Sequence, residues 1–409
     1  MQRIIKPLLR HPAMPMLLVV QVALACAIAG NAWFMLQQKM APLMAHVGVG
    51  QPQRLLVVTG LRARGTPWPA ATLRGLETQL RQLPDVETVS NAATLPMAGQ
   101  AQMLAYAYRP GRHAFVNTSV YVGDNLVKTL GLHLVAGRDF SAAEKATTLN
   151  AGMGYHRAGP VIITRALARR LFPDGPALGH AITFTGSQSQ RTVVGIVAHL
   201  MRNDLTGDHR HNLDISMLFP GTPARWPAPH FAVRAKHAVD ARLIQSVRRL
   251  VTQQLGPRLL AGTWPKVERF AVLRARALAP ARAATWLFAA VTLIVLIVTG
   301  TGIAGMTSYQ VRQRTRQIGV QRALGAPRRA VVRALQCENL LLMGLGIGVG
   351  AVLAFASNAW LIEHYAFSRL PLSLLPVGTA VLIAIGQLAV LVPARKAAGI
   401  APVSALRAI

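Results

Sequence analysis

The sequence predicts a membrane protein with four transmembrane α-helices, in which a large α+β extracytoplasmic domain is inserted between the first helix and the other three. Composition is the first reason, because 52% of the 409 residues are apolar and only 14% are charged, too hydrophobic for an ordinary soluble enzyme. The second reason is that the apolar residues gather in four stretches of about 20 residues, the length that a spanning helix needs. These stretches are Met14–Leu36, Thr285–Met306, Asn339–Leu361 and Leu372–Val392.

The first stretch allows two interpretations. Gln21 and Asn31 weaken it as a span without excluding one, and Ala25-Cys26-Ala27 loosely resembles the cleavage site of a signal peptide. The apolar run is nevertheless long for a signal peptide and continues through Leu36, beyond that site. We therefore expect a retained transmembrane helix rather than a cleaved leader.

Lys and Arg residues orient the expected spans, because short loops rich in these residues stay on the cytoplasmic side. Both tails are basic, and the loop before the third span holds seven arginines, whereas residues 362–371 hold one arginine and one glutamate. We therefore expect both termini in the cytoplasm and residues 37–282 outside it. The expected boundaries are 1–13 (cytoplasmic tail), 14–36 (first span), 37–282 (extracytoplasmic domain), 285–306 (second span), 307–338 (cytoplasmic loop), 339–361 (third span), 362–371 (outer loop), 372–392 (fourth span) and 393–409 (cytoplasmic tail).

The extracytoplasmic domain is basic, since it holds 30 of the 44 Lys and Arg residues against 12 of the 14 Asp and Glu. A basic surface favours anionic partners such as lipid headgroups or acidic peptides, but a general arginine bias explains the charge equally well. Nucleic acid is not expected, because the basic residues are scattered and lie outside the cell. The two cysteines, Cys26 and Cys337, lie in or beside spans, so we expect no structural disulfide.

Strand-like and helix-like segments alternate along this domain, which predicts an α+β fold, either undivided or split into two lobes. Two stretches lack a clear pattern, a polar one at Ser141–Gly159 and one rich in Pro, His, Asp and Asn at Met201–His230, and both are expected to be loops. The expected strands are Leu55–Val58, Val86–Ser90, Phe115–Val122, Gly159–Ile163, Thr192–Val197 and Phe231–Arg234, and the expected helices are Ala70–Gln82, Asp124–Leu130, Thr164–Leu171 and Asp240–Gln254.

The second of these loops contains the only cluster with metal-ligand chemistry, Asp204, Asp208, His209, His211 and Asp214. A His-x-His pair on a loop is common without a metal, and no pattern of supporting residues accompanies it. A hydrolytic site is equally unsupported, because no G-x-S-x-G nucleophile motif is present. We therefore expect no catalytic residue, no metal and no cofactor.

The arginine-rich loop between the second and third spans is the most informative segment. Val311, Thr315 and Ile318 fall on one helical face, and Leu324-Gly325-Ala326-Pro327 predicts a helix stop followed by a proline-started helix. Such a small-residue turn beside the bilayer suits docking against a soluble partner. The alternative is an ordinary amphipathic helix whose arginines hold anionic lipid.

Three segments of the chain resemble the MacB/FtsX family of ABC-transporter permeases. Residues 312–326 (RQRTRQIGVQRALGA) resemble the family's loop before its third span, and residues 393–407 (PARKAAGIAPVSALR) its closing cytoplasmic motif. Residues 131–140 (GLHLVAGRDF), 161–173 and 193–197 (VVGIV) resemble the MacB-like periplasmic core domain. Their order on a one-plus-three arrangement of spans makes the resemblance specific.

The resemblance implies a dimeric permease subunit of the inner membrane, driven by a separate cytoplasmic ATPase and acting as a lever for export or extraction of a substrate. The second permease subunit would be an identical or a different chain, and a periplasmic adaptor is a further possible partner. The alternative is a regulator that moves an envelope hydrolase or sensor without transport. No Gly-Lys dipeptide occurs in the sequence, so it contains no Walker A loop and we do not expect the chain to be an enzyme.

The resemblance also assigns roles to residues of the basic loop. The loop departs from the family pattern at three positions. Gln313 and Gln317 stand where the family often has acidic residues, and Gln321 stands where it has a basic one. The loss of the two carboxylates would affect which ATPase subunit is recognised. The residues expected to couple to the ATPase are Ile318, Gly319, Ala323, Leu324, Gly325 and Ala326, and the basic residues of the loop are Arg312, Arg314, Arg316 and Arg322.

Two features of the third span remain open on sequence grounds. Glu338 stands among apolar residues at its inner end, either held imperfectly by Arg333 or interacting with the helix dipole. Gly346 and Gly350 form a small-xxx-small pattern that permits close helix packing, within the subunit or across a dimer.

Overall fold

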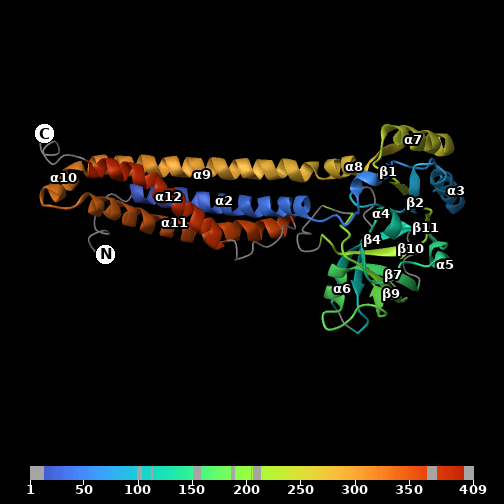
Figure 1. The fold of residues 1–409 in the computed structure, drawn as a ribbon. Coiled ribbons are helices and arrows are strands. Elements are labelled where there is room, and N and C mark those ends of the chain that lie inside the picture. The colour runs from blue at the N-terminus through green and yellow to red at the C-terminus, as the bar shows by residue number, and fades with distance from the viewer. Residues whose placement is uncertain are drawn as a thin grey trace. The chain divides into compact units, whose positions relative to one another are not determined.

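The computed structural model describes residues 13–98, 104–111, 114–150, 158–185, 189–203, 205, 213–365 and 375–399. The chain divides into two compact units, a helical unit (residues 1–40 and 281–409) and an α+β unit (Ala41–Pro280). In the helical unit, the long helices α2, α9, α11 and α12 run side by side, and the short α10 joins α9 to α11 at one end (Figure 1). Their bounds are Ala13–Met44 (α2), Ala279–Gln313 (α9), Thr315–Ala323 (α10), Arg328–Tyr365 (α11) and Leu375–Ala398 (α12).

Four of these helices are long and apolar enough to cross a membrane, as the sequence predicts. The shortest candidate span, Pro376–Ala398, has 23 residues. At 1.5 Å per residue this length is about 35 Å, more than the roughly 30 Å of a hydrocarbon core. Each helix is longer than the apolar stretch expected from the sequence, because helical hydrogen bonding continues into the polar flanks.

The two polar residues of the first stretch connect α2 to its neighbours. The Gln21 side chain donates from Nε2 to the carbonyl oxygen of Val298 on α9, at 3.2 Å. Asn31 Nδ2 donates to Ser357 Oγ on α11, at 3.3 Å, and to a backbone carbonyl of its own helix. Hydrogen bonds between helices stabilise packing in an apolar environment, which accounts for these residues within an apolar helix.

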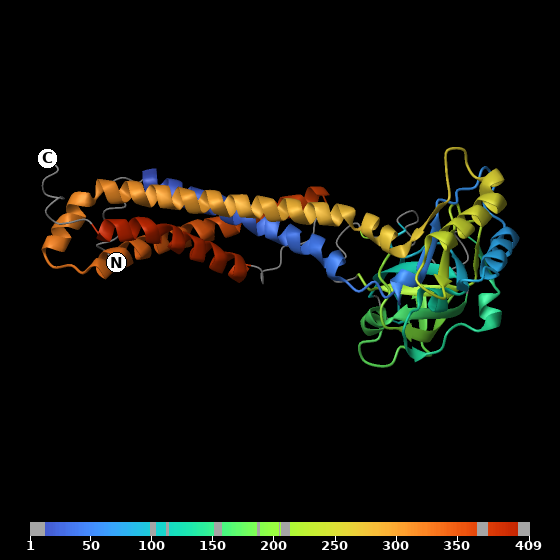
Figure 2. The same ribbon diagram turned by 45° about the horizontal axis from the view of Figure 1, so that its top comes forward.

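The α+β unit is built on one large mixed sheet (Figure 2). Within the described residues, strands β10, β7, β9, β8, β3 and β4 pair successively, and β10 also pairs with β4, so that these strands close into a ring. Strands β2, β12, β1 and β13 extend the sheet beyond β4, and β5 pairs with β9. The bounds are Leu55–Thr59 (β1), Val86–Ala92 (β2), Leu104–Tyr108 (β3), Val116–Gly123 (β4), Leu134–Gly137 (β5), Thr148–Asn150 (β6), Gly159–Thr164 (β7), Ala181–Phe184 (β8), Arg191–Val197 (β9), Ser216–Pro220 (β10), Thr222–Ala224 (β11), His230–Ala235 (β12) and Lys266–Arg269 (β13).

The helices of this unit follow their sequence signals. Thr164 Oγ1 accepts the backbone N–H of Leu167, and Asp240 Oδ1 accepts that of Leu243, so both residues cap helices as Thr and Asp favour. On α7, leucines and valines spaced by four residues are buried, which places the helix against the extended part of the sheet. The helices are Ala70–Arg81 (α3), Leu126–Leu130 (α4), Ala142–Lys145 (α5), Arg165–Leu171 (α6), Ala241–Leu255 (α7) and Phe270–Ala277 (α8).

The predicted α+β class is confirmed, but two predicted loops are wrong in part. Within Ser141–Gly159, the Ser141 hydroxyl and the Glu144 carboxylate form a capping box that starts α5, and β6 follows. Within Met201–His230, β10 and β11 form short buried strands. Their pattern was hidden because fully buried strands do not alternate and these two contain prolines.

Candidate functional site

The segment between α9 and α11 contains the residues expected to couple to an ATPase. α9 ends at Gln313, and α10 begins two residues later, at Thr315. The Thr315 hydroxyl donates to the carbonyl oxygens of Val311 (3.0 Å) and Arg312 (2.9 Å), so it bridges the break between the two helices. The helix stop expected after Ala323 is confirmed, since α10 ends there and α11 begins at Arg328, directly after Pro327.

One face of α10 is buried in the helical unit. Ile318 is only 7% exposed and belongs to the same apolar cluster as Val311 of α9 and Ala394, Ala397 and Ala398 of α12. Gly319, the next residue, is buried as well. α10 is therefore packed against α9 and α12 within the bundle.

The turn after α10 is exposed, in contrast to the buried face. The Leu324 side chain is 83% exposed, Ala323 and Gly325 are also exposed, and Ala326 is half-buried. Gly325 has φ +93°, a left-handed conformation that glycine adopts without strain, and no atom lies within 4 Å of where a Cβ would be. The turn therefore presents an isolated apolar side chain on a backbone whose shape depends on glycine.

The arginines of the segment have different environments. Arg312 is exposed, whereas Arg314 Nη1 donates to Glu338 Oε2 on α11, at 2.9 Å. The side chains of Arg316 and Arg322 lie outside the described part of the structure. Sequence reasoning missed the Arg314–Glu338 pair, because the two residues are 24 positions apart, one at the break between α9 and α10 and the other on α11.

Glu338 is 8% exposed, and in the described part of the chain its second oxygen, Oε1, has no hydrogen-bond partner. The helix-dipole interpretation is wrong, because α11 begins ten residues earlier and the dipole acts within the first turn. The Arg333 interpretation is wrong as well, since Arg314 is the residue that pairs with Glu338.

Gly346 and Gly350 face α2 of the same chain. A Cβ on Gly346 would lie 2.8 Å from Val22 Cβ, and one on Gly350 would lie 2.6 Å from the Ala23 carbonyl oxygen. By contrast, a Cβ on Gly344 or Gly348 would meet no atom within 4 Å. The two glycines of the small-xxx-small pattern therefore allow α2 to approach α11 closely.

Of the Asp/His cluster, only Asp214 lies within the described residues, whereas Asp204, Asp208, His209 and His211 lie outside them. Asp214 accepts hydrogen bonds from the backbone N–H of Leu200 (2.6 Å) and pairs with the ring of His199 (2.8 Å). Burial raises the pKa of Asp214, and these two contacts oppose the shift. Among the residues that the structure describes, no three His, Cys, Asp or Glu side chains are placed to hold a metal ion.

A second polar cluster lies under α3 in the α+β unit. Glu77 is 6% exposed, and Asn91 Nδ2 donates both to Glu77 Oε2 (2.7 Å) and to Asp124 Oδ2 (3.1 Å). Burial, and next the neighbouring Asp124, raise the pKa of Glu77 to about 9, whereas an ion pair with Arg81 opposes the shift. The Glu77 carboxyl group is therefore protonated at neutral pH.

This cluster should make the stability of the α+β unit depend on pH. Because the pKa of Glu77 is about 9 in the folded protein and 4.5 for the free side chain, the folded state keeps a proton that the unfolded state releases. Stability should therefore fall as the pH rises from about 5 to 9. Glu77→Gln should flatten this profile when thermal unfolding of the full chain in nanodiscs is followed against pH. Glu87→Gln, at a half-exposed carboxylate paired with Arg54, is the control, and a profile unchanged by Glu77→Gln would contradict the raised pKa of Glu77.

Comparison with known proteins places both units in families. Residues 19–250 match the model of the MacB-like periplasmic core domain, and residues 289–402 match that of the FtsX-like permease C-terminal domain. The chain is 26% identical over 390 residues to the macrolide export ATP-binding/permease protein MacB of Chromobacterium violaceum, covering 90% of this chain and 56% of that protein. It is 25% identical over 329 residues to the pyoverdine export ATP-binding/permease protein PvdT of Pseudomonas aeruginosa. That match covers 78% of this chain and 47% of that protein.

The chain thus spans about half the length of the curated relatives it matches. Among solved structures, the periplasmic region of MacB from Actinobacillus actinomycetemcomitans is similar over 57% of this chain and 96% of that one. The sequence identity to that region is 11% and the TM-score is 0.37. The match to the periplasmic-core model covers more than half of the residues, and the chain therefore belongs to the family of ABC-type membrane permeases that join a MacB-like periplasmic core domain to an FtsX-like permease domain.

Proposed function

We propose that this protein is the permease subunit of an ABC exporter, driven through α10 and the turn Leu324–Ala326 by an ATPase on a separate chain. The observation that carries the proposal is the exposed Leu324 on a turn that follows a helix buried against the bundle. The names of the relatives combine ATP binding, permease and export, and the sequence of this chain contains no Gly-Lys dipeptide that would form a Walker A loop.

In this proposal the four apolar helices cross the bacterial inner membrane, one before and three after the periplasmic α+β unit, with the boundaries that the sequence predicts. Both termini and α10 lie in the cytoplasm, because the arginines around α10 favour that side. ATP-driven movement of the partner would act on α10, and the buried Ile318 would pass it to α9 and α12. The exposed Arg312 of this loop would contact anionic lipid headgroups.

The working unit is proposed to contain a second permease subunit and, in the periplasm, an adaptor. The names of the relatives mention macrolide and pyoverdine export, and the substrate of this chain is proposed to be a compound handled at the periplasmic face. The regulatory alternative has no observation of its own in its favour, so export is the function that we propose.

The proposal is tested by the association of the ATPase with the tagged permease, comparing wild type, Leu324→Glu and Leu324→Met. Burying a leucine contributes about 1.5–3 kcal/mol, and a factor of ten in affinity corresponds to about 1.4 kcal/mol, so Leu324→Glu should weaken association at least tenfold. Leu324→Met retains the apolar contact and should behave as wild type. The readouts are ATPase that co-purifies in mild detergent and ATP hydrolysis by the complex.

Gly325→Glu should also uncouple ATP hydrolysis while leaving membrane insertion intact, but it changes two properties at once. At φ +93° a side chain costs about 1–2 kcal/mol of backbone strain, so a loss of function would not separate shape from charge. Gly325→Ala introduces the strain without the charge and completes the comparison. An ATPase that binds Leu324→Glu as tightly as wild type, or no ATPase even after crosslinking, would overturn the proposal.

A further inference from the structure

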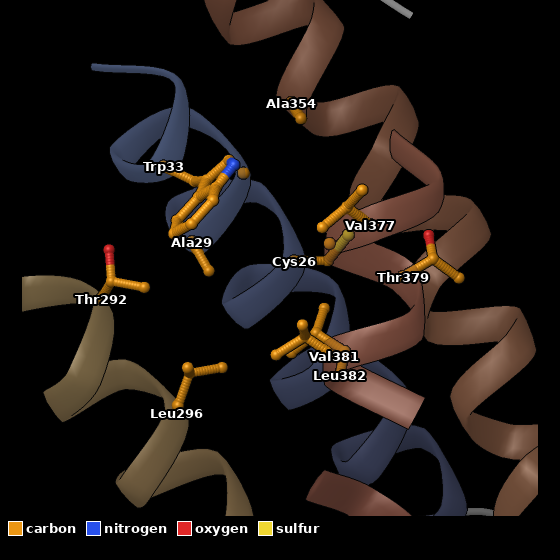
Figure 3. Close-up of a pocket in the computed structure, with 12 residues that line it drawn as sticks. Cys26, Ala29, Trp33, Thr292, Leu296, Ala354, Val377, Thr379, Val381 and Leu382 are labelled. Atoms are coloured by element: carbon orange, nitrogen blue, oxygen red, sulfur yellow. The ribbon is translucent and has the colours of Figure 1, made fainter. Parts of the chain in front are cut away.

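An apolar cavity of about 140 Å³ lies inside the helical unit (Figure 3). Helix α2 lines it with Cys26, Ala29 and Trp33, and Leu296 of α9 faces Leu382 of α12 across it. Further along, α9 and α12 come together, because a Cβ on Gly300 would lie 3.4 Å from Ile385 Cγ2. The cavity is therefore closed where these helices meet, at its end away from Trp33.

The lining offers little to a water molecule. The Thr292 hydroxyl already donates to the carbonyl oxygen of Phe288 at 2.7 Å, and the Cys26 thiol is directed to that of Ile347 at 3.9 Å. A buried water needs two to four polar partners, whereas apolar cavities stay dry and take apolar guests. Thr379 and Trp33 add one hydroxyl and one indole N–H, and the rest of the lining is hydrocarbon, so the cavity favours an apolar occupant.

The exposure of the lining residues indicates that an occupant would enter from the membrane. Val377 and Val381 of α12 line the cavity and are still 52% and 43% exposed, so the cavity opens on the surface of a spanning helix. Trp33 lies near the end of the expected span, the level at which tryptophans contact the membrane interface. From Trp33 to Cys26 the helix rises about 10 Å, so the cavity reaches from near that interface toward the middle of the bilayer.

We propose that this cavity binds part of an acyl chain of a membrane phospholipid. A cavity of about 150 Å³ is known to hold one benzene molecule, so this one takes a stretch of about six carbons. That volume suits the middle of an acyl chain and is too small for a large ring compound. The bound chain fills the space between α9, α2 and α12 at the cavity, where these helices do not contact one another directly.

The test uses a phosphatidylcholine that carries a photoreactive diazirine in the middle of one acyl chain, incorporated with the full-length protein into nanodiscs. Adducts located by mass spectrometry should lie on Cys26–Trp33 and Val377–Leu382. Gly30→Leu and Gly378→Leu should fill the cavity, because both glycines line it and a Cβ at either position meets no atom within 4 Å. Each should reduce labelling of these segments about tenfold, since several methylene contacts are lost.

Gly344→Leu is the matched control, because Gly344 is equally open but does not line the cavity, and its labelling should equal that of wild type. The proposal is overturned if both cavity variants are labelled as strongly as wild type, or if a diazirine in the headgroup labels the same segments instead.

A second measurement uses the native thiol and needs no cavity variant. In Cys337→Ser protein, where Cys26 is the remaining cysteine, a membrane-soluble maleimide should alkylate Cys26 more slowly with phospholipid present than in detergent alone. Equal rates would also overturn the proposal. Neither experiment involves the ATPase, so a negative result would leave the coupling role of Leu324 untouched.

Discussion

Arg314→Ala is expected to destabilise the helical unit more than any other single change in the loop. Removing one partner of a buried ion pair typically costs about 3–5 kcal/mol, because the other charge remains buried without compensation. Glu338 is 8% exposed and its Oε1 already lacks a partner among the described residues, so the loss of Arg314 would leave the whole carboxylate unpaired. The Arg314 side chain is 27% exposed, which favours the lower end of that range.

The measurement is the thermal transition of the protein in nanodiscs, with Arg312→Ala as the matched control. Arg312 is two residues away and exposed, so its removal should shift the transition little. The double variant Arg314→Leu/Glu338→Leu should regain most of the stability, because it removes both charges together. If Arg314→Ala and Arg312→Ala had equal effects, the ion pair would not contribute to the stability of the folded protein.

The pair also has a consequence for the proposed mechanism. Arg314 lies at the break between α9 and α10, and its carboxylate partner is on α11, so the pair connects the three helices around the proposed docking turn. A partner that moved α10 would therefore act on α11 through this contact as well as on α12 through Ile318. Arg314→Ala should consequently reduce the coupling between ATP hydrolysis and export even at temperatures where the variant remains folded.

Much of this architecture could be predicted because its signals are local. The four apolar stretches predict the four long helices, and the Gly-Ala-Pro sequence after Leu324 predicts where one helix stops and the next begins. In the α+β unit, Thr164 and Asp240 mark helix starts through the capping chemistry of their side chains. Each of these inferences needs only neighbouring residues.

The features that were missed depend on residues far apart in the sequence. The closed ring of strands requires β10 to pair with β4, about a hundred residues earlier, and no pattern within either strand specifies that partner. The ion pair of Glu338 joins α11 to the break between α9 and α10, and the partner of Gly350 is on α2, more than 300 residues away. The capping box at Ser141 is the exception, because its Ser-x-x-Glu signal is local and was available in the sequence.

Gly350→Leu is expected to disrupt the packing of α2 against α11, whereas Gly348→Leu should be tolerated. A Cβ on Gly350 would lie 2.6 Å from both the Ala23 carbonyl oxygen and Cys26 Cβ, and backbone atoms of a packed helix cannot move aside as a flexible side chain can. Overpacking of this kind typically costs about 1–3 kcal/mol, and more where the helices must separate. At Gly348, two residues away on the same helix, a Cβ meets nothing within 4 Å.

Both variants add the same side chain to the same helix, so propensity and hydrophobicity are matched and the difference reports only the contact with α2. We expect Gly350→Leu to lower the thermal transition in nanodiscs by several degrees and Gly348→Leu to leave it near that of wild type. Gly350→Ala should fall between them, since its single methyl group already overlaps Ala23. Equal transitions for Gly350→Leu and Gly348→Leu would show that α2 does not pack on this face of α11 in the membrane, and the Gly346-x-x-x-Gly350 pattern would then be free to serve another helix.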